Sequence, residues 1–154
     1  MNEEILSPAS GKVLEVDEDS RTITIFMHLY NNHITTAPLD GMVKKIRPEK
    51  GSFAPAFFRS ADFNMKNTIE LSTAYGDVKV VQLAGIFTRK ILCDVKEGQV
   101  VSKGERIGKI CFGSRVDLSF PMGFKPIVKK GAKVKCGRTA IASLNPSRLN
   151  RKQL

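Results

Sequence analysis

The sequence predicts a single, mainly β domain, a barrel or sandwich with at most one or two short helices. Its 154 residues are 42% hydrophobic and 26% charged, which is the size and composition of one ordinary globular domain. Short runs with apolar residues at every second position recur along the chain, and no long stretch has helical periodicity. Glycines separate these runs, as they do between strands. These observations together favour an all-β architecture.

The individual elements follow from the same patterns. Residues 22–27 (TITIFM) alternate polar and apolar at their start, which is typical of a strand with one buried face. The one candidate for a short helix is Phe87–Cys93, between Gly85 and Asp94. The expected strands are 12–16, 22–27, 42–46, 68–71, 78–83 and the shorter 127–128. We expect residues 1–144 to form the domain and residues 145–154 to form a basic C-terminal tail.

Net charge is distributed unevenly along the chain. Residues 1–40 carry seven acidic and two basic side chains, whereas residues 41–154 carry eight acidic and 23 basic ones. No acidic residue follows Asp117, and nine basic residues do. Such a basic end suits an anionic membrane surface or polymer, and it is equally explained by solubility. Nucleic acid is not expected as a partner, because aromatic residues are few and no nucleic-acid-binding motif is present.

Cysteine and histidine usage argues against disulfides and metal. Cys93, Cys111 and Cys136 are far apart, no C-x-x-C is present, and the chain has only two histidines. The N-terminus lacks a basic segment followed by an apolar stretch, and no apolar run has the length of a membrane span. We therefore expect a cytoplasmic, reduced protein without a metal site.

Residues 95–108 combine closely spaced glycines with intervening valines. This pattern predicts a hairpin-like hammerhead in a barrel-sandwich fold, and it is similar to that of biotinyl and lipoyl carrier domains. Met65-Lys66 also resembles the Met-Lys of a biotinylated hairpin. A carrier modified on Lys66 is therefore one alternative, although carriers are much shorter than this chain.

Five segments, in order over about 110 residues, resemble the phosphatidylserine decarboxylase family in its short, archaeal-type form. The most specific is residues 104–117, GERIGKICFGSRVD, a near-complete match to the family's G-E-R-I-G-x-I-x-F-G-S-R-V-D. The other four are residues 7–11 (SPASG), 26–41 with His33 and the ending APLDG, 64–67 (NMKN) and 82–89 (QLAGIFTR).

The resemblance implies an enzyme that makes its own pyruvoyl group and uses neither pyridoxal phosphate nor metal. Ser114 Oγ would attack the carbonyl of Gly113, and elimination from the resulting ester would leave chains 1–113 and 114–154 held together. The dehydroalanine at 114 would hydrolyse to a pyruvoyl group, which forms a Schiff base with the substrate amine and accepts electrons as carbon dioxide leaves. The implied substrate is phosphatidylserine or a related serine phospholipid. Its head group and backbone, and the oligomeric state, stay open.

The resemblance also assigns roles around Ser114. His33 is expected to act as general acid or base beside the pyruvoyl group. Arg115 and Arg89 are candidates to hold the substrate carboxylate or phosphate, because a guanidinium pairs with either. Each arginine is equally a candidate for a structural ion pair, for instance with Asp117.

The chain departs from the family at residues that support self-cleavage. The aspartate of the family's S-P-A-D-G is Ser10, a basic position after the family's histidine is Thr36, and N-E-R-N has become NMKN. A hydroxyl does not stabilise an imidazolium as a carboxylate does, so Asp40 and Asp117 are the candidate replacements. A second alternative is therefore a non-processing relative that binds lipid or another protein. Membrane contact is expected to be peripheral, through residues 125–154.

Overall fold

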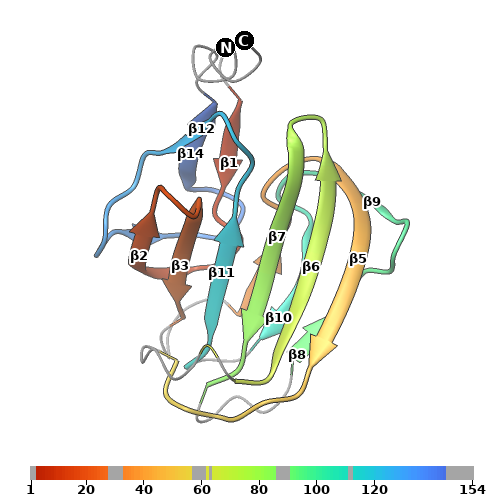
Figure 1. Cartoon of the computed structure of the whole chain (residues 1–154), viewed down its shortest axis with the longest axis vertical. Helices are drawn as coiled ribbons and strands as arrows, with labels where there is room; N and C mark the ends of the chain where they lie inside the picture. The colour runs from red at the N-terminus through yellow and green to blue at the C-terminus, as the bar shows by residue number, and fades with distance from the viewer. Residues whose placement is uncertain are drawn as a thin grey trace.

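The computed structural model describes residues 3–27, 33–56, 62, 64–85, 91–110 and 113–144. These residues form fourteen strands in three sheets and contain no α-helix (Figure 1). The strands are β1 (Glu4–Leu6), β2 (Gly11–Asp17), β3 (Thr22–Phe26), β4 (Ile34–Thr36), β5 (Gly41–Glu49), β6 (Lys66–Thr73), β7 (Gly76–Leu83), β8 (Ile91–Cys93), β9 (Val100–Val101), β10 (Arg106–Ile110), β11 (Arg115–Ser119), β12 (Phe124–Pro126), β13 (Lys133–Val134) and β14 (Ala140–Leu144).

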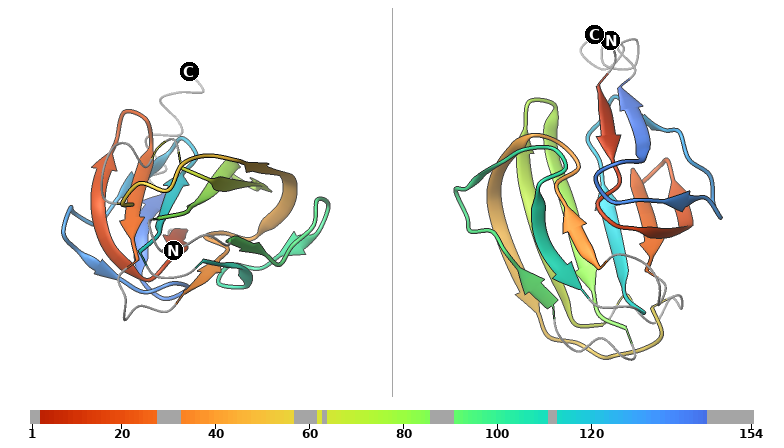
Figure 2. Two further views of the ribbon diagram at one scale, coloured as in Figure 1. Left: turned by 90° about the horizontal axis from the view of Figure 1, so that it is seen from below. Right: turned by 180° about the vertical axis from the view of Figure 1, so that it is seen from behind.

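The largest sheet has eight antiparallel strands in the order β13-β2-β3-β11-β7-β6-β5-β9. Its central strands are long and alternate buried with more exposed side chains, because one face is covered and the other is closer to solvent. The sheet curls strongly into a half-barrel (Figure 2). Strand β11 lies between β3 and β7 and therefore joins the two halves of the curl.

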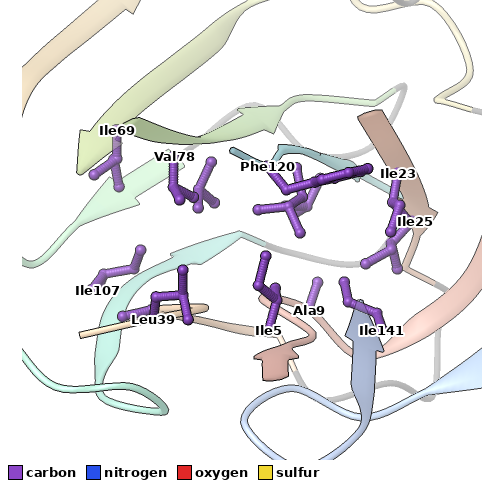
Figure 3. Packing of buried hydrophobic residues seen from close by; sticks show 14 of the residues in the cluster. Ile5, Ala9, Ile23, Ile25, Leu39, Ile69, Val78, Ile107, Phe120 and Ile141 are labelled. Carbon is purple, nitrogen blue, oxygen red and sulfur yellow. The ribbon is translucent and has the colours of Figure 1, made fainter. Parts of the chain in front are cut away.

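Two smaller sheets, β4-β10-β8 and β1-β14-β12, close the concave side of the half-barrel (Figure 2). The apolar core lies between them and the large sheet, as Figure 3 shows. Each fully buried aliphatic side chain there contributes about 1.5–3 kcal/mol to folding. The labelled side chains include Ile23, Ile25, Ile69 and Val78 from the large sheet and Ile5, Ile107 and Ile141 from the smaller ones.

The predicted mainly β single domain is confirmed, and so are five of the expected strands, which are β2, β3, β5, β6 and β7. The prediction of a strand at 127–128 is wrong, because β12 ends at Pro126 and Ile127 is half exposed. The predicted helix is wrong over Ile91–Cys93, since those residues pair with β10 as strand β8. The remainder of that stretch lies outside the described residues.

The segment 95–108 does not close as a hairpin. Strand β9 pairs with the start of β5, whereas β10 pairs with β4 and β8. The turns expected from its glycines are present, because Gly98 and Gly104 have φ of 89° and 86°, a conformation that favours glycine. The glycines thus predicted the turns but not the partners of the strands between them.

Candidate active site

The core-facing side chains become polar at one end of the molecule, the lower end in Figure 1. On β7, Gln82 follows Val80 on the core face, and Asn67 lies opposite it on β6. Asn67 Nδ2 donates to Gln82 Oε1 at 3.2 Å, and Gln82 Nε2 donates to the Thr35 hydroxyl at 3.2 Å. These three buried side chains form a polar network that ties β4, β6 and β7 together.

Ser114 lies at the same end, immediately before β11. Its side chain is fully buried, and the alternation of strand side chains places it on the core face with Val116 and Leu118. Ser114 Oγ lies 3.4 Å from Met27 Sδ. Two backbone hydrogen bonds of 2.9 Å, from Met27 N–H to Ser114 O and from Gly113 N–H to Met27 O, hold the 113–114 peptide bond against the end of β3.

Gly113 requires the absence of a side chain. Its φ is 76°, in the left-handed region that side chains with a Cβ rarely adopt. Its carbonyl is packed against Gly85, the second residue after β7: a Cβ on Gly85 would overlap with Gly113 O and lie 2.8 Å from the Gly113 carbonyl carbon. Two glycines from distant parts of the sequence therefore meet at the bond before Ser114.

Asn64 fixes the residue that precedes Gly85, through the carbonyl of Ala84. The Asn64 side chain is fully buried, and its Oδ1 accepts from the Ala54 N–H at 2.9 Å. Its Nδ2 donates to the carbonyls of Ala54 and Ala84, at 2.8 and 2.6 Å. This amide thus fastens residue 84, and with it Gly85, to the 52–56 segment.

His33 also belongs to this end of the molecule. Its carbonyl accepts the N–H of Ile110, three residues before Gly113, at 3.0 Å. His33 directly precedes β4 and is two residues before Thr35, so strand alternation directs both side chains to the same face. Because the Thr35 hydroxyl meets Gln82 on β7, that face looks toward the polar network beside Gly85.

Asp40 is not brought to this site. Its carboxylate accepts the N–H of Lys103 at 2.7 Å and is exposed. Asp40 precedes β5, whose Met42 is in register with Ser72 and, through it, with Asp77 of β7. Asp77 and Leu83 are six residues apart on β7, which corresponds to about 20 Å along a strand. Asp40 therefore lies at the opposite end of the sheet from Gly113.

Arg115 and Asp117 lie on the outer face of β11, opposite the face that carries Ser114. Arg115 Nε and Nη2 donate to the two carboxylate oxygens of Asp117, at 2.9 and 3.0 Å, and Nη2 also donates to Asp62. The cluster faces an open groove of about 1040 Å³, whose lining includes Thr24, Lys129 and Lys130. The Arg115 guanidinium is thus neutralised by two carboxylates.

Burial and charge pairing shift the pKa values of Arg115 and Asp117 in opposite directions. Burial raises the pKa of Asp117, and the attraction of Arg115 offsets that effect only in part. Burial by itself would lower the pKa of Arg115, but Asp117 and Asp62 together outweigh it, so this pKa is raised. The raised pKa of Arg115 keeps the guanidinium charged, whereas the raised pKa of Asp117 makes that carboxyl easier to protonate than a free aspartate.

The two substituted positions near the N-terminal motif make structural hydrogen bonds. Ser10 Oγ accepts the N–H of Cys136 at 2.9 Å. Thr36 Oγ1 donates to the Ser7 carbonyl at 3.2 Å, and Thr36 N–H donates to the Pro8 carbonyl at 2.9 Å. The segments 7–10 and 34–36 are therefore bound side by side.

Lys66 is the first residue of β6 and pairs with Glu49 and Leu83 on either side. Its Nζ donates to the Asp62 carbonyl at 2.7 Å. A lysine within paired strands does not present itself at a hairpin tip, so this geometry does not support a carrier modified there. Arg89, the second candidate arginine, lies outside the described residues.

Within the described ranges, no group of three His, Cys, Asp or Glu side chains is arranged to bind a metal ion. No helix in that part of the chain is long and apolar enough to cross a membrane.

Comparison with known proteins matches this chain to decarboxylase proenzymes. It is 40% identical over 144 residues to a putative archaetidylserine decarboxylase proenzyme of Methanosarcina mazei, covering 94% of this chain and 68% of the relative. It is 42% identical over 139 residues to the protein of the same name from Archaeoglobus fulgidus, with 90% and 70% covered. A phosphatidylserine decarboxylase proenzyme of Ralstonia pickettii is 40% identical over 151 residues, with 92% and 70% covered. No solved structure matches the chain.

The fold and these relatives define the class as a β-rich decarboxylase of the carboxy-lyase type. The family model described as phosphatidylserine decarboxylase matches residues 1–142. The chain belongs to the phosphatidylserine decarboxylase family, as its motifs predicted.

Three residues, two beside Gly113 and one in the Arg115 cluster, had no assigned role in the sequence. Asn64 and Gly85 stood within matched motifs, but only the fold brings them to Gly113. Asp62 had no signal at all, because its partner Arg115 is 53 residues away in sequence.

Proposed function

We propose that this chain is a pyruvoyl-dependent decarboxylase proenzyme, which cleaves itself between Gly113 and Ser114 and then decarboxylates a serine phospholipid. The observation that carries the proposal is the placement of Ser114, buried directly after a left-handed glycine at the polar end of the core. Membership of a family whose relatives bear the name proenzyme supports it.

Self-cleavage uses only atoms of the chain and water. Ser114 Oγ attacks the Gly113 carbonyl carbon, and its proton passes to a base while the amide nitrogen becomes a free amine in the ester. Loss of the Ser114 Cα proton then breaks the Cβ–Oγ bond and releases Gly113 with a carboxylate. Water hydrolyses the resulting dehydroalanine, and ammonia leaves. A glycine at 113 favours the first step because no side chain obstructs the attack.

The residues present fit the group that this reaction makes. A pyruvoyl group has the same three carbons as the serine residue, so it fills the volume that Ser114 already occupies beside Met27. Its ketone and adjacent carbonyl supply an electron sink for decarboxylation. His33, directed toward the same end of the core, is proposed to move the protons of cleavage and of carbanion quenching. Arg115 and Asp117 are proposed as a structural ion pair on the opposite face.

Intact-mass measurement of the purified chain tests the first half of the proposal. We expect the 17.0 kDa chain to be replaced by two chains, residues 1–113 and 114–154, with a blocked N-terminus on the second. Ser114→Ala should stay a single folded chain, because it lacks the nucleophile. Ser119→Ala, at the far end of the strand that Ser114 precedes, is the control and should cleave like the parent. An intact parent chain after long incubation contradicts the proposal.

Release of carbon dioxide from lipid vesicles tests the second half. Vesicles of a serine phospholipid with ester-linked chains are compared with the ether-linked equivalent, and with free serine as a control. Carbon dioxide from either lipid, and none with Ser114→Ala, supports the proposal. Cleaved protein that acts on neither lipid contradicts the proposed substrate.

One observation favours the alternative of a non-processing relative. Ser10 stands where the family has its aspartate, and its hydroxyl accepts the N–H of Cys136. Asp40 lies at the far end of the sheet, and Asp117 is bound to Arg115 on the outer face. Ser10→Asp distinguishes the enzyme from the non-processing relative. If the parent cleaves slowly and the variant cleaves faster, the protein is an enzyme with weakened self-cleavage. If the parent and the variant both stay intact, the protein is a binding protein.

We further propose that the protein contacts anionic membranes peripherally. Lys125, Lys129, Lys130, Lys133, Lys135 and Arg138 are all exposed. None of the ion pairs among the described residues involves any of them. Exposed cations outside ion pairs attract an anionic surface, at about 1 kcal/mol for each.

A further inference from the structure

The bond proposed to break is held by a contact that the catalytic chemistry does not itself require. Gly113 O occupies the space that a side chain on Gly85 would fill, and Ala56 Cβ borders the same space at 3.5 Å from a Cβ built there. Gly85 is opposite Gly113 when the register of β7 with β11, in which Leu83 pairs with Arg115, is continued by two residues. The carbonyl is therefore confined by the backbone of the neighbouring strand.

Gly85 is in turn held by a buried side chain. Asn64 makes four hydrogen bonds, to the Ser52 hydroxyl, the Ala54 N–H and the carbonyls of Ala54 and Ala84. The Ala84 N–H donates to the Met65 carbonyl at 2.9 Å, so residue 84 is fixed through both of its backbone polar groups. With residue 84 fixed on both sides, Gly85 has little freedom to move away from Gly113.

We infer that Gly85 and Asn64 are positioning residues for the 113–114 bond. Because Gly85 has no side chain, the Gly113 carbonyl can pack against its backbone, and this contact sets the orientation of the carbonyl. Asn64 holds the backbone at residue 84 and so keeps Gly85 in position. This inference rests on the proposed self-cleavage. Its physical reason is that attack on a carbonyl needs a defined approach, and a displacement of about 1 Å can cost about 10²-fold in rate. The inference assigns neither residue a proton-transfer step.

A cleavage assay tests the inference with matched variants. Gly85→Ala should slow cleavage by about 10²-fold, because its methyl group displaces the Gly113 carbonyl. Gly41→Ala is the control: its Cβ would lie 2.6 Å from the Ser72 carbonyl oxygen, a milder clash of the same kind at the far end of the sheet. Asn64→Ser should also slow cleavage. Its control is Asn67→Ser, which removes a buried asparagine that is hydrogen-bonded to Gln82 instead. At an equal loss of stability, Asn67→Ser should slow cleavage less.

A second measurement detects the displacement without any cleavage. In Ser114→Ala protein labelled with [1-¹³C]glycine and [¹⁵N]alanine, only the 113–114 and 131–132 peptide bonds join the two labels. An HNCO-type NMR spectrum therefore has two signals. Adding Gly85→Ala or Asn64→Ser should shift the 113–114 signal and leave the 131–132 signal in place. If Gly85→Ala does not fold, Asn64→Ser decides by the same two readouts.

The outcomes separate the inference from the proposed function. A parent that cleaves, with Gly85→Ala cleaving as fast as Gly41→Ala and an unmoved 113–114 signal, overturns the inference alone. A parent that never cleaves overturns the proposed function and the positioning role with it. Slow cleavage together with a shifted signal supports both.

Discussion

At the scale of single residues, the most unusual group is the Arg115 cluster. The Arg115 side chain is 9% exposed and that of Asp117 is 21% exposed, yet both are charged and bound to each other. Removing one member of such a buried pair typically costs about 3–5 kcal/mol, because the other charge stays desolvated. Arg115→Met should therefore lower the free energy of unfolding by about 3 kcal/mol while leaving self-cleavage measurable. Urea unfolding of the Ser114→Ala form measures it, and loss of substrate binding without loss of stability would contradict the structural role.

The raised pKa of Asp117 gives a second prediction with a definite sign. A carboxyl whose pKa is higher in the folded than in the unfolded state binds its proton first in the folded state. It therefore contributes stability that is present at low pH and lost as pH rises through the folded-state pKa. Relative to Asp117→Asn, the parent should gain thermal stability as pH falls from 7 toward 4. Melting curves in the Ser114→Ala background measure this difference, and a relative loss would contradict it.

His33 carries the third prediction, which concerns proton transfer. His33→Ala should reduce cleavage or decarboxylation by about 10²–10⁴-fold, the usual effect of removing a general acid or base. The histidine backbone bond to Ile110 is unaffected by the change, so the fold should persist. Rates are measured by intact mass and by carbon dioxide release. Unchanged rates would leave His33 a structural residue.

At the scale of elements, the polar network at the end of the core predicts that removing one of its side chains lowers the stability of the fold. Gln82 accepts from Asn67 and donates to Thr35 and to the Leu92 carbonyl, thereby joining β4, β6, β7 and β8. Gln82→Leu removes the partner of the buried Asn67 and Thr35 side chains, which costs about 1–3 kcal/mol. Chemical denaturation measures the loss. Gln99→Leu, at an exposed glutamine, is the control and should change stability little.

The same elements explain how much the sequence could predict. Strands β2, β3 and β7 bury one face, so their alternation is readable from local sequence. Strands β8 and β9 have three and two residues, too short for any period, and they exist because β10 and β5 pair with them. The Gly-Ser motif indicated the bond that we propose is cleaved, whereas the role inferred for Gly85 depends on a register between strands that no local pattern contains.

At the scale of the whole molecule, the position of the proposed cleavage predicts a stable two-chain product. Residues 114–144 include β11, β13 and β14, which pair with β3 and β7, with β2 and with β1 respectively. Cleavage before β11 breaks one covalent bond and leaves all of these strand pairs intact. The two chains should therefore elute together at the size of the uncleaved form and separate only in denaturant. Separation in native buffer would contradict the fold.

The last prediction concerns the basic surface formed by the six exposed cations between Lys125 and Arg138. Replacing Lys129, Lys130 and Lys133 by glutamine should weaken binding to anionic vesicles by about 10²-fold, because each cation near such a surface contributes about 1 kcal/mol. Replacing Lys45, Lys79 and Lys96, also exposed, changes net charge equally but lies on other strands and loops, so it should weaken binding far less. Vesicle sedimentation measures both variants. Binding should fall as salt rises, because charges are screened beyond about 8 Å at physiological ionic strength. Equal loss in the two triple variants would mean that net charge alone attracts the protein, and indifference to lipid charge would leave these lysines with a role in solubility only.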